Sequence, residues 1–412
     1  MRRVILLILD GVGIGAMEDV PKVRPADVGS DTLRHVAEAV GGLRLPHLES
    51  LGLGNIHAVP GVTPVAHPLA NWGTALLRYL GADSFLGHQE LMGALPRQAP
   101  EELFEAVRIK VIQALQASGH DVQVPFPDRP ALLVDKRVVV GDNLESDPLQ
   151  TYHCVGSLDE LDLKRVESVA GIVRQVARVR RVVAMGGHGF TVQDMLRCVE
   201  RRPSGQTGIN NVALGLYTKD YVVRHLTLDV DVSQQLPAKL AARGVPISMV
   251  GKIADIVRAD GARMVPLVDT RPILRETLAT VRSQTEGFIA VNVQDTDLAG
   301  HDENPRRFAD VLELCDQAIG ELWGVLAPGD VLLITSDHGN DPSIGHDKHT
   351  REAVPVLAYV PARTSRPIPT RHSLADLAAT VAELLGADPP ESGESFAPML
   401  EEPEEGLRSD HV

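Results

Sequence analysis

The feature that most constrains the fold is the segment Val331–Thr335, VLLIT, an uninterrupted apolar and β-branched run that follows Pro328-Gly329. Such a run is typical of a strand buried in a parallel sheet. Asp337 and His338 come directly after it, and His349 lies eleven residues beyond His338. Ligands bind at the carboxyl edge of open parallel sheets, so the pattern predicts a metal site there. The alternative is a surface loop that is rich in Asp and His.

Two other apolar runs end in the same kinds of side chain. Asp10 follows Val4–Leu9, and Asp295, Asp297 and His301 follow Phe288–Val293. Because parallel strands end at one edge of a sheet, these side chains are expected to meet those of the first run. Mixed carboxylate and imidazole donors suit divalent ions such as Mn²⁺, Zn²⁺ or Mg²⁺ better than a thiolate site does. The sequence therefore predicts a centre that holds two divalent ions.

Strand-type and helix-type patterns alternate on both sides of a middle segment, residues 98–222, whose predicted strand ends lack such ligands. This alternation is typical of an α/β fold with a doubly wound sheet. Since 412 residues are too many for one typical core, the middle segment is predicted to be an inserted domain, in which Leu132–Val140 forms one strand. The other predicted parts are a core of residues 1–97 and 223–400, whose sheet resumes near Leu226, and an acidic tail at 401–412.

The composition narrows the function. A formal charge of −15 and a pI near 5.4 argue against nucleic-acid binding, which needs clustered Lys and Arg. The three cysteines have no CxxC spacing and are expected to be reduced thiols of a cytoplasmic protein. No apolar run approaches the roughly 18 residues of a membrane span. The expected partner is therefore a small molecule.

Ser84 is the candidate nucleophile. It stands in the glycine-flanked segment GADSFLGHQELMG, residues 81–93, four residues ahead of His88. A serine hydroxyl is a poor nucleophile at neutral pH, but coordination to a divalent cation lowers its pKa. The alternative is a helix N-cap, a common position for serine.

Seven sequence blocks carry a resemblance to a known family. Taken in order, ILDGVGIGAMEDV, DVGSDTLRHVAEAVGGLRLPHLESLGLGNI, GADSFLGHQELMG, VGKIADI, DTDLAGH, LLITSDHGNDP and DKHTREAVPVLAY resemble blocks of the phosphopentomutases, a branch of the alkaline phosphatase superfamily. The resemblance implies an alkaline-phosphatase-like core with two metals at the edge of its sheet and a mobile α+β cap. The inserted segment resembles the family's cap only in position and size.

The resemblance also implies roles for individual residues. It assigns Asp10, Asp337 and His338 to one ion and Asp297, His301 and His349 to the other. It makes Ser84, where the family has threonine, the phosphorylated hydroxyl and a further ligand. Asp297 is preferred to Asp295 because it stands four residues before His301, as in the related cofactor-independent phosphoglycerate mutases. Phosphopentomutases place this carboxylate five residues before the histidine, where this chain has Thr296.

The residues that contact substrate in the family are only partly matched. Lys252 matches a substrate contact, and His88 matches a histidine that either orients Ser84 or serves the structure. Met185 stands for an arginine and Gly156 for an aspartate of the family's cap. These two replacements predict weak activity on ribose phosphates, and Met185→Arg is expected to raise it.

The predicted function is metal-dependent phosphoryl transfer through a phosphoserine at Ser84. The resemblance implies an isomerase of the ribose 1-phosphate/ribose 5-phosphate type. One alternative is a phosphohydrolase or mutase that acts on another small phosphorylated or phosphonate metabolite. Another is an inactive metal-binding protein that serves in interactions.

Overall fold

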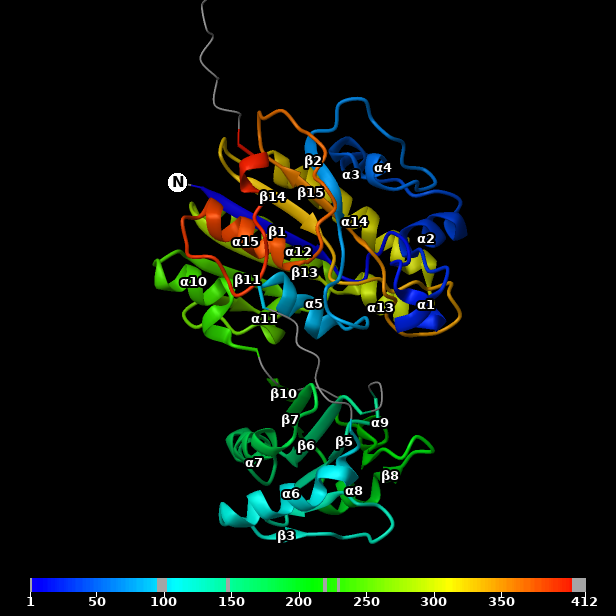
Figure 1. Cartoon of the computed structure of the whole chain (residues 1–412), viewed down its shortest axis with the longest axis vertical. Coiled ribbons are helices and arrows are strands. Elements are labelled where there is room, and N and C mark those ends of the chain that lie inside the picture. Colours follow the sequence, from blue (N-terminus) through cyan, green and yellow to red (C-terminus); the bar gives the residue numbers. More distant parts are fainter. Residues whose placement is uncertain (1, 95–101, 146–148, 218–220, 228–229, 402–412) are drawn as a thin grey trace, which may run out of the picture. The chain divides into compact units, whose positions relative to one another are not determined.

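The computed structural model describes residues 2–94, 102–145, 149–217, 221–227 and 230–401. The chain divides into two compact units, which we call the core unit, Met1–Pro96 with Asp231–Val412, and the inserted unit, Arg97–Val230 (Figure 1). Residues 402–412 of the predicted acidic tail lie outside the described residues.

The core unit is built on a seven-stranded sheet in the order β12-β11-β13-β1-β14-β15-β2. The first five strands of this order are parallel, and β15 and β2 are antiparallel strands at one edge. β1 lies in the middle, so all seven of its residues are buried. The bounds are β1 Arg3–Leu9, β2 Ala70–Ala75, β11 Ile247–Gly251, β12 Arg263–Val265, β13 Gly287–Val293, β14 Val331–Thr335 and β15 Val354–Tyr359.

Helices cover both faces of this sheet (Figure 1). Side chains alternate along β1, so Leu7 enters one apolar cluster while Leu6 and Ile8 enter the other. The first cluster includes α2 Thr32–Val40, α3 Pro46–Leu51, α4 Leu53–Ile56, α12 Thr270–Ser283 and α14 Pro305–Trp323, and the second includes α5 Ser84–Leu91, α10 Leu236–Ala242, α11 Ile253–Ile256 and α15 Ala375–Leu384. The helices on both faces confirm the predicted doubly wound α/β core. The short helices α1 Val20–Val23 and α13 Asp295–His301 follow β1 and β13.

The inserted unit has its own sheet, in the order β10-β7-β6-β5-β4-β3. Only β6 and β7 are parallel in this sheet, and the other neighbours are antiparallel. The strand bounds are β3 Val122–Gln123, β4 Leu132–Val134, β5 Val138–Asp142, β6 Thr151–Ser157, β7 Arg181–Gly187 and β10 Val222–Thr227, and a separate hairpin consists of β8 Val199–Arg201 and β9 Thr207–Ile209. The helices are α6 Phe104–Ala117, α7 Leu163–Val176, α8 Val192–Arg197 and α9 Asn211–Leu214.

Two predictions about the inserted segment are wrong. Leu226 does not resume the core sheet, because it lies in β10 and pairs with Val182 of β7 in the inserted unit. Leu132–Val140 is not one strand, because Asp135 and Lys136 have positive φ angles of 51° and 57° and turn the chain between β4 and β5. An apolar run shows that a strand forms, but it does not show which sheet the strand joins.

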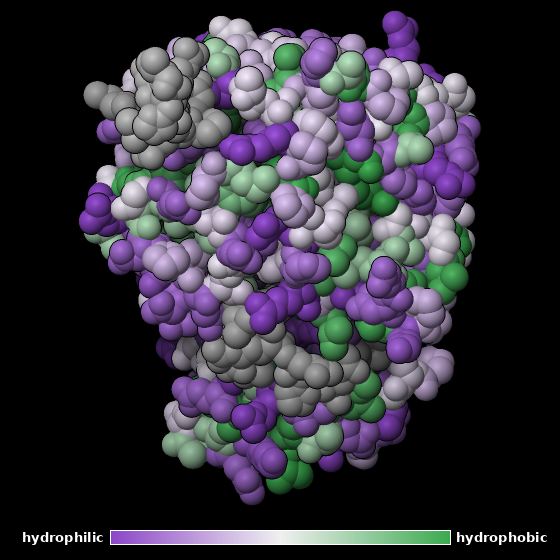
Figure 2. Space-filling view, turned by 45° about the horizontal axis from the view of Figure 1, so that its top comes forward, coloured by the Kyte–Doolittle hydropathy of each residue, from purple (hydrophilic) through white to green (hydrophobic). Residues whose placement is uncertain are grey.

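The surface is mixed in polarity. On the face drawn in Figure 2, hydrophobic residues form small groups separated by hydrophilic ones, as expected for a chain with 23% charged residues. Within the described ranges, no helix is both long enough and apolar enough to cross a bilayer.

Candidate metal centre

The parallel strands of the core unit bring the predicted ligands to one edge. β1 lies between β13 and β14, with Leu9 opposite Val293 and Ile8 opposite Thr335. The residues that follow these strands therefore leave the sheet side by side. Asp10 follows β1, α13 follows β13, and Asp337 and His338 follow β14. Lys252 follows β11 at the same edge.

One cluster contains Asp10, Ser84, Asp337 and His338. The Ser84 hydroxyl donates to Oδ2 of Asp337 over 2.9 Å. Nε2 of His338 lies 3.2 Å from the same oxygen and 3.5 Å from Oδ1 of Asp10. Asp10, Asp337 and His338 are fully buried, and Ser84 is 7% exposed. The structure thus brings these four predicted residues together.

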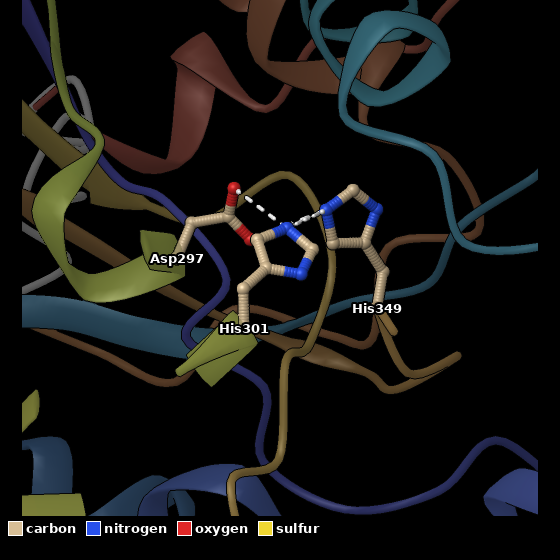
Figure 3. Close-up of side chains that lie close together, drawn as sticks. All are labelled: Asp297, His301 and His349. Carbon is tan, nitrogen blue, oxygen red and sulfur yellow. Dashed lines mark hydrogen bonds and ion pairs between the residues drawn. The ribbon is translucent and has the colours of Figure 1, made fainter. Parts of the chain in front are cut away.

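A second cluster contains Asp297, His301 and His349 (Figure 3). Nε2 of His301 lies 3.6 Å from Oδ2 of Asp297, and Nε2 of His349 lies 3.3 Å from Oδ1 of Asp297. The Nε2 atoms of the two histidines are 3.0 Å apart. The three side chains converge on one point from α13 and from the loop after β14, an arrangement suited to one shared ion.

Asp295 takes no part in this cluster. Its Oδ2 accepts a hydrogen bond from the Thr270 hydroxyl at 2.7 Å, and its Oδ1 pairs with Arg307 at 2.6 Å. Asp297 is 3% exposed and faces His301 and His349 instead. The geometry therefore favours Asp297 over Asp295 as the ligand.

Lys252 lies between the two clusters. Its Nζ is 2.9 Å from Oδ2 of Asp10 and 3.3 Å from Oδ2 of Asp297. Burial alone would lower the pKa of Lys252, but the carboxylates of Asp10 and Asp297 outweigh burial and raise it. The ammonium group of Lys252 is thus held beside a carboxylate of each cluster.

The residues present fit two divalent ions. Oδ1 of Asp10 and Nε2 of His338 are buried and have no hydrogen-bond partner among the described residues. Burial, followed by the nearby Asp337 carboxylate, raises the pKa of Asp10 to about 6. Buried polar atoms without a partner and closely spaced carboxylates are costly in free energy unless a cation binds them. Ligand atoms of Asp10, Asp297 and His338 also lie within 4.8 Å of one another, so the two candidate positions are neighbours.

Helix α5 presents Ser84 to this centre. The N-cap of α5 is Asp83, whose side chain accepts a hydrogen bond from the Leu86 amide at 2.9 Å. Ser84 is therefore the first helical residue, and the alternative N-cap role falls to its neighbour. A Cβ atom at Gly87 would lie 2.6 Å from the carbonyl oxygen of Asp337, so a glycine at this position lets α5 approach the ligand loop.

His88 and Asn292 support the first cluster. Nδ1 of His88 lies 2.8 Å from the carbonyl oxygen of Ser84 and 3.0 Å from Oδ2 of Asp337. Nδ2 of Asn292 lies 2.9 Å from Nε2 of His88 and donates to Oδ2 of Asp10 over 2.9 Å. Because an amide NH₂ only donates, His88 accepts at Nε2 and carries its proton on Nδ1. Asn292, which the sequence analysis did not identify, thus orients both Asp10 and His88.

Asn340 is a second supporting residue that the sequence analysis missed. Its Nδ2 donates to Oδ1 of Asp297 at 2.8 Å and to the Asp297 carbonyl oxygen at 3.0 Å. Its place in SDHGND, two residues after His338, was an available signal. His346 does not join the centre, since its Nε2 faces Oδ1 of Asp27 at 3.3 Å.

Met185 and Gly156, the two replaced positions of the inserted unit, are packed within that unit. Met185 is 3% exposed and belongs to an apolar cluster with Val155 and Phe190. A Cβ atom at Gly156 would lie 2.8 Å from Cγ2 of Val166, which belongs to a different apolar cluster. The two positions thus face opposite sides of the sheet. Their replacement alone is therefore a weak argument for lost ribose-phosphate activity.

Comparisons with known proteins identify the relatives of this chain. The model of the metalloenzyme superfamily matches residues 2–389. A phosphopentomutase from Desulfitobacterium hafniense is 32% identical over 421 aligned residues, which cover 96% of this chain and 99% of the relative. A phosphopentomutase from Alkaliphilus metalliredigens is 29% identical, and the alignment covers 97% of this chain and 99% of the relative. A phosphoglycerate mutase structure from Leishmania mexicana aligns over 96% of this chain and 97% of its own chain, with a TM-score of 0.45 and 14% identity.

These matches first define the class, a metal-binding enzyme of the metalloenzyme superfamily. Within that class, the chain belongs to the phosphopentomutase family. The predicted family, the alkaline-phosphatase-like fold and the prediction of a phosphomutase enzyme are thereby confirmed.

Proposed function

We propose that the protein transfers a phosphoryl group through Ser84 and interconverts ribose 1-phosphate and ribose 5-phosphate. The observation that carries this proposal is the Ser84 hydroxyl, which lies 2.9 Å from Oδ2 of Asp337, a residue of the first cluster, at the start of α5. The relatives named phosphopentomutase provide the substrate class. We propose two divalent ions, Mn²⁺ in the first place and Zn²⁺ or Mg²⁺ as alternatives, and a cytoplasmic location.

The proposed reaction has two transfers. The phosphoryl group passes from Oγ of phosphorylated Ser84 to the free hydroxyl of the sugar monophosphate, and the displaced serine oxygen takes up the proton that this hydroxyl loses, which leaves a sugar bisphosphate. Oγ of Ser84 then takes the other phosphoryl group, its proton passes to the sugar oxygen that is released, and the sugar leaves as the isomeric monophosphate. The bound ions would lower the pKa of the Ser84 hydroxyl and neutralise phosphoryl charge.

Residues of the chain contribute directly to these transfers. Asp337 accepts the hydroxyl hydrogen bond that orients Oγ of Ser84. The amino end of α5 carries partial positive charge, which favours a phosphate on its first residue. Lys252 adds a full positive charge 2.9 Å from Asp10. Developing negative charge at Ser84 therefore lies at the positive end of α5, and Lys252 adds positive charge beside Asp10 and Asp297.

Steady-state kinetics on ribose 1-phosphate and ribose 5-phosphate with saturating Mn²⁺ test the proposal. A mutase converts one isomer into the other without releasing inorganic phosphate, and intact-mass analysis finds a phosphoryl group on the Ser84 peptide. Stoichiometric phosphate release would instead show a phosphohydrolase on the same site. The sequence predicts a kcat/KM below about 10⁴ M⁻¹s⁻¹ for ribose phosphates. A higher value would show that residues of the inserted unit other than Met185 and Gly156 contact the sugar phosphate.

A further inference from the structure

Arg351 is a buried cation that the proposed chemistry does not use. It follows His349 by two residues, and its side chain is 2% exposed. It is the largest of the fully buried side chains in the described chain. A buried guanidinium is costly unless all its donors are bound, so its partners indicate its purpose.

All five N–H groups of the guanidinium are bound. Two contact the Asp19 carboxylate, from Nε at 2.9 Å and from Nη2 at 2.8 Å. The other three donate to main-chain carbonyl oxygens of a single segment, Leu77 at 3.1 Å, Tyr79 at 2.5 Å and Gly81 at 3.0 Å. This segment leads to Asp83, the N-cap of the helix that starts at Ser84.

The same segment is anchored to the first cluster from another side. The Tyr79 hydroxyl donates to the Asp337 carbonyl oxygen at 3.2 Å and accepts from the Asp83 amide at 3.2 Å. The main-chain amide of Arg351 donates to Oδ2 of Asp27 at 2.8 Å. The loop that carries His349 and the segment that leads into α5 at Ser84 are therefore joined through one side chain.

We propose that Arg351 is a positioning residue that fixes Oγ of Ser84 relative to both ligand clusters. The inference rests on the proposed role of Ser84. A misplacement of about 1 Å in a reacting group can cost roughly 10²-fold in rate. Lysine in place of Arg351 keeps the charge but offers three donors on one atom, and one atom cannot reach Asp19 and three separate carbonyls.

Arg3 is a matched control because its guanidinium has the same kinds of partner. It lies at the amino end of β1, whereas the candidate metal centre lies at the carboxyl ends of the parallel strands. It contacts the Asp330 carboxylate through Nε and Nη2, and it donates to the carbonyl oxygens of Val281 and Val325. Its side chain is 9% exposed. Arg3 begins β1, whereas Asp10 follows the end of that strand. A loss of stability alone should therefore affect both lysine variants alike.

The test compares Arg351→Lys with Arg3→Lys by kinetics on ribose 5-phosphate with Mn²⁺, below the melting temperature of each. We expect kcat to fall about 10²-fold in Arg351→Lys with little change in KM or metal content, and to stay within about threefold of wild type in Arg3→Lys. Similar kcat values for the two variants would overturn the inference. A phosphoryl adduct on Ser84 of the wild type tests the proposed function separately.

Two further measurements keep the inference testable if Arg351→Lys does not fold or wild-type turnover is slow. Asp19→Asn removes the charge that binds the Arg351 guanidinium but changes no residue of the segment 77–81. It should lower kcat about tenfold. Hydrogen exchange of the peptide 77–88 needs no substrate. It should be faster in Arg351→Lys and Asp19→Asn than in Arg3→Lys, and equal exchange in all three would contradict the inference.

Discussion

Buried carboxylates serve different ends in the two units. Oδ1 of Asp10 in the core unit is buried with no hydrogen-bond partner in the described chain, although Asp337 and His338 lie beside it. In the inserted unit, Asp142 is equally buried, but its oxygens accept the amides of Phe104 at 2.9 Å and Thr207 at 2.7 Å. A satisfied carboxylate holds a structure together, whereas an unsatisfied one among other charges indicates a ligand.

The comparison extends to the sequence blocks that resemble the family. They lie in the core unit, where the side chains they supply converge on one edge of the sheet. In the inserted unit, the two positions compared with the family, Met185 and Gly156, are packed against apolar side chains. The residues proposed to carry the phosphoryl chemistry therefore all lie in the core unit.

The largest effect is expected at Ser84 of the core unit. Ser84→Ala removes the only atom proposed to carry the phosphoryl group, so turnover should fall by at least about 10³-fold. Metal content should remain near that of wild type, because the carboxylate and imidazole ligands stay. Kinetics, elemental analysis and intact mass measure these effects.

Ser84→Thr is the matched control. It keeps the hydroxyl and adds a methyl group, and threonine is the residue that the family resemblance places there. Activity close to wild type is expected. Substantial activity in Ser84→Ala would show that Ser84 is not the nucleophile and that a hydrolytic route operates.

The next effect separates two neighbouring carboxylates of the core unit. Asp297→Ala should remove most of one ion per chain, because Asp297 lies against both His301 and His349. Asp295→Ala should leave both ions, since Asp295 binds Thr270 and Arg307. Elemental analysis of both variants after dialysis decides the assignment. Equal losses would show that the Asp297 assignment is wrong.

The sequence predicted the edge of the core sheet well for a physical reason. A buried parallel strand is a continuous apolar run, so the polar residue that ends it is conspicuous, as Asp10 is after Leu9. Asn292 escaped notice because it lies inside such a run, and its role depends on the distant Asp10 and His88. Arg351 escaped because its carbonyl partners have no sequence pattern. Long-range contacts of this kind are visible only after folding.

A smaller effect is expected for Met185→Arg in the inserted unit. The sequence predicts that this variant raises ribose-phosphate activity, but the structure places Met185 among Val155 and Phe190. An arginine there buries an unpaired charge, which should cost several kcal/mol, whereas Met185→Leu should cost less than about 1.5 kcal/mol. Chemical denaturation measures both variants. If Met185→Arg is stable and more active on ribose 5-phosphate, position 185 contacts substrate after all.

The smallest effect concerns Asp142, the satisfied carboxylate of the inserted unit. Burial raises its pKa to about 6, although the amides of Thr207 and Phe104 act in the opposite direction. Because the pKa is higher in the folded state than its ordinary value of 3.8, the stabilising contribution is complete below about pH 4 and is lost as the pH rises through 6. The shift corresponds to a change on the order of 3 kcal/mol in the free energy of unfolding.

Asp142→Asn should abolish this pH dependence, even though the amide leaves one N–H poorly bound at every pH. Asp159→Asn is a control of opposite sign, since the hydrogen bond from His188 lowers the pKa of Asp159 and its contribution is lost as the pH falls. Unfolding of wild type and both variants, followed between about pH 2 and 7 by hydrogen exchange within α6, measures both pH dependences. A constant difference between wild type and Asp142→Asn across this range would show that Asp142 does not titrate there.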